Sequence, residues 1–273
     1  MKRFFVALVG LVVLVAAAAV VAPGFINWND HRDRVSALLA SQFGRDVDIA
    51  GALDLTLLPT PILSADDVRV GGDGENAPLT LSAIEVALAP VSLLSGELRV
   101  LRAIMVDPKV QVTRQPDGSL QWPVGVATEG PIPARLATLD RVTLSNGTIV
   151  IDDPDAGQVT EITDIFAQFS GDLTTGETSL TGSFQAAGVP LAIDLQSREQ
   201  AGNGSLPVTL SLGIDGLDNE LRYAGLVGRL DGGTALQEII AGRLDRVRLQ
   251  GNLNLSGSDL AEALRRLNLV EKP

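Results

Sequence analysis

The stretch LTLLPTPILSADDVRVGG, residues 55–72, decides how the rest of the chain is interpreted. Leucines alternate with polar residues before its two prolines, and Val68 and Val70 alternate with polar residues after them. This is the two-residue period of a half-buried β-strand. Pro59 and Pro61 cannot donate to a strand ladder, so we expect them in a turn or at a sheet edge. The stretch therefore predicts two short strands with a proline-containing turn between them.

The same alternation recurs along most of the chain after residue 46. The further alternating runs are residues 79–88, 98–112, 139–152, 160–173, 180–186, 189–195, 208–214 and 247–255. Gly, Pro, Asn and Asp separate these runs, as is typical of a meander in which successive strands pair. We therefore predict a mainly β protein whose strands form an antiparallel sheet with one apolar face.

Two of these runs carry a more local signal. In LDRVTLSNGTIVIDD the Asn146-Gly147 pair suits a two-residue type I′ turn, which would place Leu144 opposite Ile149 on one face of a hairpin. In LTLSAIEVAL the apolar phase jumps by one residue near Ala83, which predicts a bulge. Because bulges bend strands, we expect a curved sheet.

The N-terminus predicts a membrane anchor. Lys2 and Arg3 precede an uninterrupted run of apolar residues and glycine at residues 4–22, which Pro23 ends. At ~1.5 Å per residue the run extends roughly 28 Å, close to the ~30 Å hydrocarbon core and longer than the apolar region of most signal peptides. We therefore predict that residues 1–28 are a retained single-pass anchor, with the N-terminus in the cytoplasm and the remainder exported.

A juxtamembrane helix is expected directly after the anchor, at residues 29–45. Its spacing places apolar residues such as Val35 and Leu39 on one face, and Asn29 or Asp30 can cap its N-terminus. Such a helix joins the anchor to the strands that follow.

A second helical pattern lies near the C-terminal end of the sequence. In SGSDLAEALRRLNLV, residues 256–270, Leu260, Leu264 and Leu267 have helical spacing. Residues 46–273 are therefore expected to form a β domain, so that the sheet has a short helix near each end.

Composition excludes several classes of partner and site. The 33 Asp and Glu residues against 21 Lys and Arg give a formal net charge of -12, which repels a phosphate backbone. Only 4% of the residues are aromatic, so few side chains can stack on bases. We therefore predict no nucleic-acid partner. The chain has no cysteine, which excludes disulfides, a thiolate nucleophile and a cysteine-ligated zinc site.

The residues that carry enzyme chemistry are also scarce. His31 is the only histidine and follows the predicted anchor, so no Ser-His-Asp triad or histidine metal cluster can form. The carboxylate pairs Asp66-Asp67 and Asp152-Asp153 are placed at predicted strand ends, where acidic residues usually occupy turns. The DDPDAG loop lacks the spacing of a calcium-binding EF-hand. We predict a protein that is not an enzyme and that has no cofactor and no metal site.

The apolar face of the predicted sheet must be covered, and too few helices follow residue 50 to cover it. The sheet can close on itself, pack as a sandwich, or keep an open apolar trough for a ligand. The candidate lining of such a trough is Leu55, Leu57, Val68, Val70, Leu81, Val86, Val110, Val112, Leu144 and Ile149. The same residues would form the core of a closed sandwich, and the pattern alone leaves both arrangements open.

Two stretches of the sequence resemble the AsmA family domain. In FGRDVDIAGALDLTLLPTPILSADDVRVGG, the matching elements are a Gly-Arg pair at 44–45, a Leu-Pro-x-Pro-x-Leu element at 58–63 and Asp-Val-Arg-Val at 67–70. In LSAIEVALAPVSLLSGELRVLRAIMVDPKVQVTRQPDGSLQW, they are Leu-Leu-Ser-Gly at 93–96, Asp-Pro at 107–108, Asp-Gly at 117–118 and a tryptophan at 122. The resemblance is good from residue 1 to about residue 170 and looser beyond. It rests on a pattern of elements, not on catalytic residues.

The resemblance implies an elongated, folded-over β-sheet groove on a protein anchored in the inner membrane of a Gram-negative bacterium, with its bulk in the periplasm. AsmA-like proteins are associated with outer-membrane assembly and with the movement of phospholipids between membranes. The implied partners are the inner-membrane bilayer, a phospholipid cargo and envelope or outer-membrane assembly proteins. The alternative is a structural module that assists assembly or targeting of outer-membrane proteins, with a closed β core and no lipid. Family members are often longer than 273 residues, so the resemblance fits either a short paralogue or an N-terminal piece.

Overall fold

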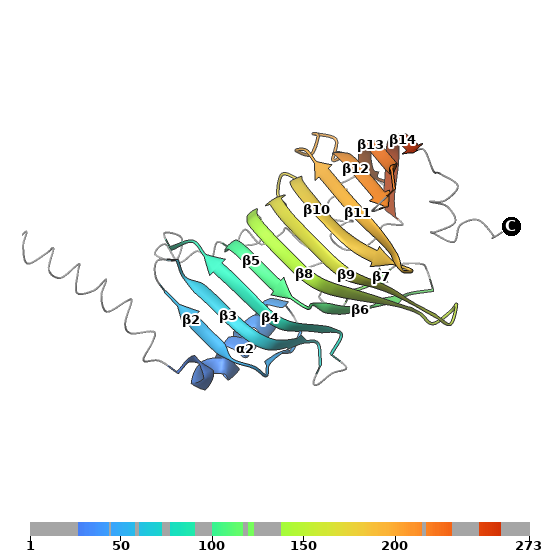
Figure 1. The fold of residues 1–273 in the computed structure, drawn as a ribbon. Helices are drawn as coiled ribbons and strands as arrows, with labels where there is room; N and C mark the ends of the chain where they lie inside the picture. Colours follow the sequence, from blue (N-terminus) through green and yellow to red (C-terminus); the bar gives the residue numbers. More distant parts are fainter. Residues whose placement is uncertain are drawn as a thin grey trace, which may run out of the picture.

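One sheet of 14 strands accounts for almost all of the described chain after residue 46 (Figure 1). The computed structural model describes residues 27–43, 45–57, 60–72, 77–90, 100–116, 120–122, 138–214, 217–230 and 246–257 of the 273. The strands are β1 (Val47–Ile49), β2 (Leu53–Thr56), β3 (Ile62–Val70), β4 (Leu79–Leu88), β5 (Val100–Val106), β6 (Lys109–Arg114), β7 (Leu120–Gln121), β8 (Thr138–Asp153), β9 (Gln158–Asp172), β10 (Glu177–Ala186), β11 (Val189–Ser197), β12 (Leu206–Ile214), β13 (Asn219–Arg229) and β14 (Val247–Gly257). The prediction of a mainly β protein is confirmed.

The order of the strands is that of a meander, except for one parallel connection between β6 and β8. From β8 to β14 every strand pairs antiparallel with the next one in the sequence. β5 and β6 both pair antiparallel with β4 and parallel with β8, so together they fill one position in the sheet. The sheet is therefore rich in antiparallel pairs but not purely antiparallel as predicted, because the chain re-enters at β8 in the direction of β6. Figure 1 shows that the sheet is long and curved.

A helical segment precedes the sheet where the sequence predicted one. The 3-10 helix η2 (Trp28–His31) continues into α2 (Arg32–Phe43). The N-cap is Asn27, earlier than the predicted caps, and its side-chain oxygen accepts a hydrogen bond from the backbone N–H of Asn29 at 3.3 Å. The predicted helix is confirmed, and Figure 1 shows α2 beside β2, β3 and β4.

Several predicted features lie outside the described residues. They are the anchor at residues 1–28 apart from its last two residues, the proline at residue 59, and the helix at residues 256–270, whose first two residues end β14. Within the described part of the chain, no helix is both long enough and apolar enough to cross a membrane.

Four Asp and Asn residues on neighbouring strands have a left-handed backbone conformation. Asp67 on β3, Asp107 between β5 and β6, Asn146 on β8 and Asp164 on β9 have φ angles of 49°, 47°, 57° and 50°. Asp and Asn tolerate this conformation better than most other residues with a side chain. The amide of Asn146 donates to the carboxylate of Asp107 at 2.6 Å, which ties the β8 member to its neighbour. We call these four residues the bulge line.

The bulge line keeps apolar side chains on one face of the sheet. Between β8 and β9 the pairing shifts on both sides of Gly147, so that Leu144 lies opposite Ala167 and Ile149 lies opposite Ile162. Each residue with the left-handed conformation reverses the alternation of its strand once, so apolar residues before and after the line share a face although their spacing is odd.

The hairpin predicted at Asn146-Gly147 is wrong. β8 continues through this pair, which lies in the middle of the strand. Asn146 has the positive φ that a type I′ turn requires, but Gly147 does not, and Gly147 is buried against Leu144, Ile165 and Pro108. Because a type I′ turn requires positive φ at both central residues, the pair forms a bulge and the strand continues.

Near Ala83, where a bulge was predicted, β3 and β4 both reverse the alternation of their side chains at the same level of the sheet. Leu81 and Ile84 lie in one core cluster, so β4 does change phase there. The pairing of β4 with β3 nevertheless keeps one register on both sides of the pair Asp66 and Ala83. Asp67 reverses the alternation of β3 at the same level, so neither strand gains an extra residue relative to the other.

A close approach of β13 and β14 explains two glycines and gives a testable prediction. A Cβ added at Gly225 would meet the carbonyl oxygen of Gln250, would lie 2.6 Å from the Cα of Gly251 and would lie 2.7 Å from the hydroxyl of Tyr223. We expect Gly225→Val to lower the free energy of unfolding by about 2 to 3 kcal/mol, because backbone atoms cannot move aside cheaply.

The measurement for Gly225→Val is the midpoint of urea unfolding followed by β-sheet circular dichroism. Gly228 on the same strand is the matched control, since a Cβ there meets nothing within 4 Å. Equal midpoints for Gly225→Val and Gly228→Val would show that the close approach does not limit the sheet.

Candidate functional site

The register of the strands brings one apolar side chain from each of 11 strands into a continuous row. The row runs across β2, β3, β4, β5 and β8 to β14 and has no charged member. Its residues, in order across the sheet, are Leu55, Leu63, Val86, Ala103, Val142, Phe169, Leu180, Leu195, Leu210, Tyr223 and Leu253. We call it the Phe169 row.

A second row, two residues away on each strand, is also free of polar side chains. Its residues are Leu53, Ala65, Ile84, Met105, Leu144, Ala167, Gly182, Ile193, Leu212, Leu221 and Leu255. We call it the Ala167 row. Because side chains two residues apart on a strand point to the same side, the two rows together form one apolar face.

The row that lies between these two points to the opposite side of the sheet and is polar. Its residues are Ser64, Glu85, Ile104, Thr143, Gln168, Thr181, Asp194, Ser211, Arg222 and Asn254. We call it the Gln168 row, and Ile104 is its only apolar member. The sheet therefore has one apolar and one polar face along its whole length.

The polar face carries two ion pairs, one between β4 and β5 and one within β13. Arg102 pairs with Glu85 at 2.5 Å, and Arg222 pairs with Glu220 at 3.0 Å. A hydrogen bond from Ser211 and then that from Arg222 hold the pKa of the exposed Glu220 below its ordinary value. Exposed ion pairs of this kind contribute little to stability, so their main value here is to identify the solvent-facing side of the sheet.

The apolar face is covered at its N-terminal end. Trp28, Val35, Leu39 and Ala40 of the helical segment pack against a cluster of strand residues. The buried members of that cluster are Val47, Ile49, Leu53, Ala65, Val68, Val70 and Leu81. The helical segment thus closes the face over β1 to β4 in the way that an ordinary core is closed.

Beyond β5, the clusters on the apolar face are made by neighbouring strands. One joins Val189, Leu191 and Ile214 with partly buried residues of β10 to β12, and the other joins Leu206, Tyr223 and Val227 with residues of β12 to β14. In the part of the chain that the structure describes, no helix or second sheet contributes to either cluster.

The predicted lining residues are divided between these two regions. Val68, Val70 and Leu81 lie in the closed cluster under the helical segment. Leu55 and Val86 belong to the Phe169 row and Leu144 to the Ala167 row, and all three are partly buried. The remaining predicted lining residues are Leu57, Val110, Val112 and Ile149. Leu57 follows β2 and is partly buried. Val110 and Ile149 are partly buried and pair with each other, and the buried Val112 pairs with Ile151.

The sequence reasoning missed the C-terminal half of the face. The missed members are Phe169, Leu180, Leu195, Leu210, Tyr223 and Leu253. Most lie in segments predicted as strands, so continued alternation was the signal that could have found them. Tyr223 lies on β13, which was not predicted.

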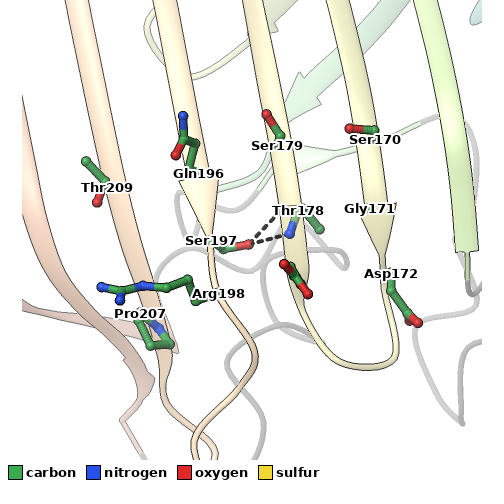
Figure 2. Close-up of a pocket in the computed structure, with 11 residues that line it drawn as sticks. Ser170, Gly171, Asp172, Thr178, Ser179, Gln196, Ser197, Arg198, Pro207 and Thr209 are labelled. Carbon is green, nitrogen blue, oxygen red and sulfur yellow. Dashed lines mark hydrogen bonds between the residues drawn. The ribbon is translucent and has the colours of Figure 1, made fainter.

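The described hollow lies on the polar side, away from this face. Figure 2 shows the side chains of Ser170, Ser179, Gln196 and Thr209 along its wall. Asp172, at its rim, accepts hydrogen bonds from the backbone N–H of the two following threonines, which is a turn-capping role. The hollow therefore presents mainly hydroxyl and amide groups, and the carboxylate of Asp172 is already engaged by the turn.

The other residues considered for chemistry are dispersed. His31 lies in η2 with its ring 6.0 Å from that of Trp28. Asp66 and Asp67 lie within β3 and not at its end as predicted, because Asp67 belongs to the bulge line. Asp152 and Asp153 do end β8. Among the described residues, no three His, Cys, Asp or Glu side chains are grouped so that they could hold a metal ion.

Comparison with known proteins covers most of the sheet. The AsmA family model matches residues 1–187, which is more than half of the 273 residues. No curated protein matches the chain. The matched range ends in the turn after β10, yet β10 pairs with β11 from Thr178 to Ala186 and both apolar rows continue to β14. From the match, the chain belongs to the AsmA family.

Proposed function

We propose that this protein is a non-enzymatic lipid carrier, anchored in the inner membrane, whose periplasmic sheet shelters phospholipid acyl chains on its apolar face during transport between membranes. The observation that carries the proposal is the pair of unbroken apolar rows. With ~4.8 Å between strands, the Phe169 row extends about 48 Å. The family to which the chain belongs supports an envelope-related role.

The dimensions and chemistry of the face fit acyl chains. A bilayer core about 30 Å thick holds two layers of acyl chains, so one chain occupies about 15 Å, the width of about four neighbouring strands. The rows present aliphatic side chains and no charge, which favours methylene groups over polar ligands. At ~0.8 kcal/mol for each buried CH₂, sheltering ten methylenes contributes on the order of 8 kcal/mol.

The position of the face along the chain also supports the proposal. The predicted anchor precedes α2 in the sequence, and α2 closes the end of the face that is formed by the first strands. The face then continues without a covering helix in the described residues from β5 to β14, away from that end (Figure 1). Lipid would therefore be carried beyond the helical segment, toward the part of the sheet most distant in sequence from the anchor.

A second candidate function is favoured by the edge strand. β14 is 11 residues long, contains one charged residue, Arg248, and pairs with β13 on one side. Long edge strands without protective charges or prolines are templates for strand addition. An interaction module that adds a strand from an outer-membrane or assembly protein is the alternative to lipid transport.

Site-specific photocrosslinking of the full chain in a Gram-negative host tests the proposed function. The photoreactive residue p-benzoylphenylalanine replaces Phe169, which belongs to the apolar row, or Gln168, its neighbour on the polar face. We expect phospholipid adducts at position 169 and none at position 168, detected by mass spectrometry of the purified protein.

Two results of this experiment would count against the lipid carrier. A protein adduct at position 169 without lipid would favour the interaction module. Absence of any adduct at position 169, in a folded protein that reaches the membrane, would indicate that the face is closed.

A further inference from the structure

β14 is an outer strand of the sheet that is long, regular and exposed (Figure 1). Among the described strands it pairs only with β13, and its 11 pairs show no register shift. Leu249, Leu253 and Leu255 are 64%, 66% and 51% exposed. An outer strand of this kind presents backbone N–H and C=O groups beside apolar side chains, which favours the addition of a further strand.

The opposite edge of the sheet is protected against such addition. β1 and β2 are three and four residues long, and each carries an aspartate, Asp48 or Asp54. The helical segment packs against the cluster to which both strands contribute. Short strands, charged side chains and a covering helix all keep an edge from pairing. β14 is 11 residues long, has no proline and carries one charge, on Arg248, so its own sequence supplies little of this protection.

The sequence of β14 is complementary to itself in antiparallel pairing. In VRLQGNLNLSG, leucine and glycine alternate with Gln and Asn around Asn252. Rotation about a two-fold axis at Asn252 places every residue of the strand opposite a residue of a second copy. On the apolar face Leu249 lies opposite the second copy's Leu255, and on the polar face Gln250 lies opposite the second copy's Asn254. Apolar side chains therefore meet apolar ones, and amides meet amides.

The charges of β14 do not oppose this pairing. Arg248 is its only charged residue, and in this register it lies opposite the second copy's Ser256. The two copies of Arg248 are then about 26 Å apart along the paired strands, at ~3.3 Å per residue. This separation is about three times the ~8 Å Debye length at physiological ionic strength, so the two guanidinium groups hardly repel each other.

The pairing is also large enough to hold two copies together. Antiparallel pairing along the whole of β14 forms about 10 backbone hydrogen bonds, the number in a typical protein interface. We infer that β14 pairs with β14 of a second copy of this chain, antiparallel about a two-fold axis at Asn252. The two sheets then form one, and the apolar face is continuous across both copies. This inference needs no lipid and does not rest on the proposed function.

Single cysteines in the full chain test this register, and the chain has no natural cysteine to confuse the result. Asn252→Cys lies on the axis, and Gln250→Cys and Asn254→Cys are controls on the same face of the same strand. We expect mild oxidation to give a disulfide-linked dimer at position 252, because directly opposed Cβ atoms lie about 5 Å apart. Each control position lies about 13 Å along the strand from its counterpart, too far for a disulfide.

Co-expression of the two control variants completes the test. Gln250→Cys together with Asn254→Cys should give a disulfide-linked dimer although neither does so alone, because the register opposes these two positions. Non-reducing electrophoresis and intact mass identify each product. Equal yields at all three single positions, or no dimer at position 252, would overturn the inference. A disulfide between position 252 and a different protein would assign the edge to that protein instead.

A second measurement uses no cysteine. Leu253→Lys should weaken the dimer by at least about tenfold in sedimentation of the full chain in detergent, since it places two like charges about 7 to 8 Å apart across the axis. Leu253 is 66% exposed, so we expect the circular dichroism to stay native. Asn254→Lys, on the polar face, is the control and should leave the dimer unchanged. A monomer before any substitution, or equal weakening by both variants, would contradict pairing through β14.

Discussion

Ile49→Asp is expected to unfold the N-terminal end of the sheet. Ile49 is 1% exposed and lies in the cluster between β1 to β4 and the helical segment. Removing its side chain alone would cost about 3 kcal/mol, and a buried carboxylate without a partner adds several more. Since whole domains are stable by only about 5 to 15 kcal/mol, we expect most of that stability to be lost.

Chemical denaturation followed by circular dichroism measures the effect of Ile49→Asp. The matched control is Asp48→Ala, because Asp48 is exposed and its ion pair with Arg69 is long, at 3.6 Å. The control should change the free energy of unfolding by less than about 1 kcal/mol. A denaturation midpoint for Ile49→Asp close to that of the control would mean that this end of the apolar face is not a closed core.

The double variant Leu180→Asp with Leu195→Asp should lose bound phospholipid while remaining folded. The two leucines pair across β10 and β11 in the Phe169 row, and both are only partly buried. Charges introduced there stay in contact with water but repel acyl chains from two adjacent strands. We expect more than about a tenfold loss of phospholipid that co-purifies with the full chain, the equivalent of about 1.4 kcal/mol or more of binding energy.

Native mass spectrometry and lipid extraction provide the measurement for the leucine variant. Thr181→Asp with Gln196→Asp is the control, since it adds the same charges to the same strands on the polar face. Lipid retained by the leucine variant would contradict the carrier proposal. Global unfolding of that variant, but not of the control, would instead favour a closed core over an open face.

The local pattern of the sequence predicted the strands well. β4 was predicted at residues 79–88, where it lies, and β9, β11, β12 and β14 were predicted within a few residues of their ends. Residues 139–152 were predicted to be extended, but as a hairpin and not as the single strand β8. Alternation is a local property, so a single chain suffices to read it. β13 was missed because Arg222, Gly225 and Gly228 interrupt its apolar residues.

Features set by distant contacts could not be predicted in the same way. The parallel pairing of β5 and β6 with β8 depends on where the chain returns after β7, which no local pattern encodes. Asn146-Gly147 has the composition of a hairpin turn, and only its neighbours make it a bulge: Asp107 binds the Asn146 amide, and Gly147 is buried against Pro108. Likewise, sequence alone did not show that the helical segment closes the face over Val68 and Val70.

The pairing of each strand with its neighbours in sequence affects how proteins with such a sheet can become longer or shorter during evolution. From β9 to β13 each strand is hydrogen-bonded to the strand before it and the strand after it, so this region behaves as a one-dimensional array in which stability accumulates between nearest neighbours. An array of this kind can gain or lose a hairpin at its far end without rearranging the strands nearer the helical segment. The length of the apolar face is therefore a property that evolution can extend in steps of two strands, about 10 Å at a time.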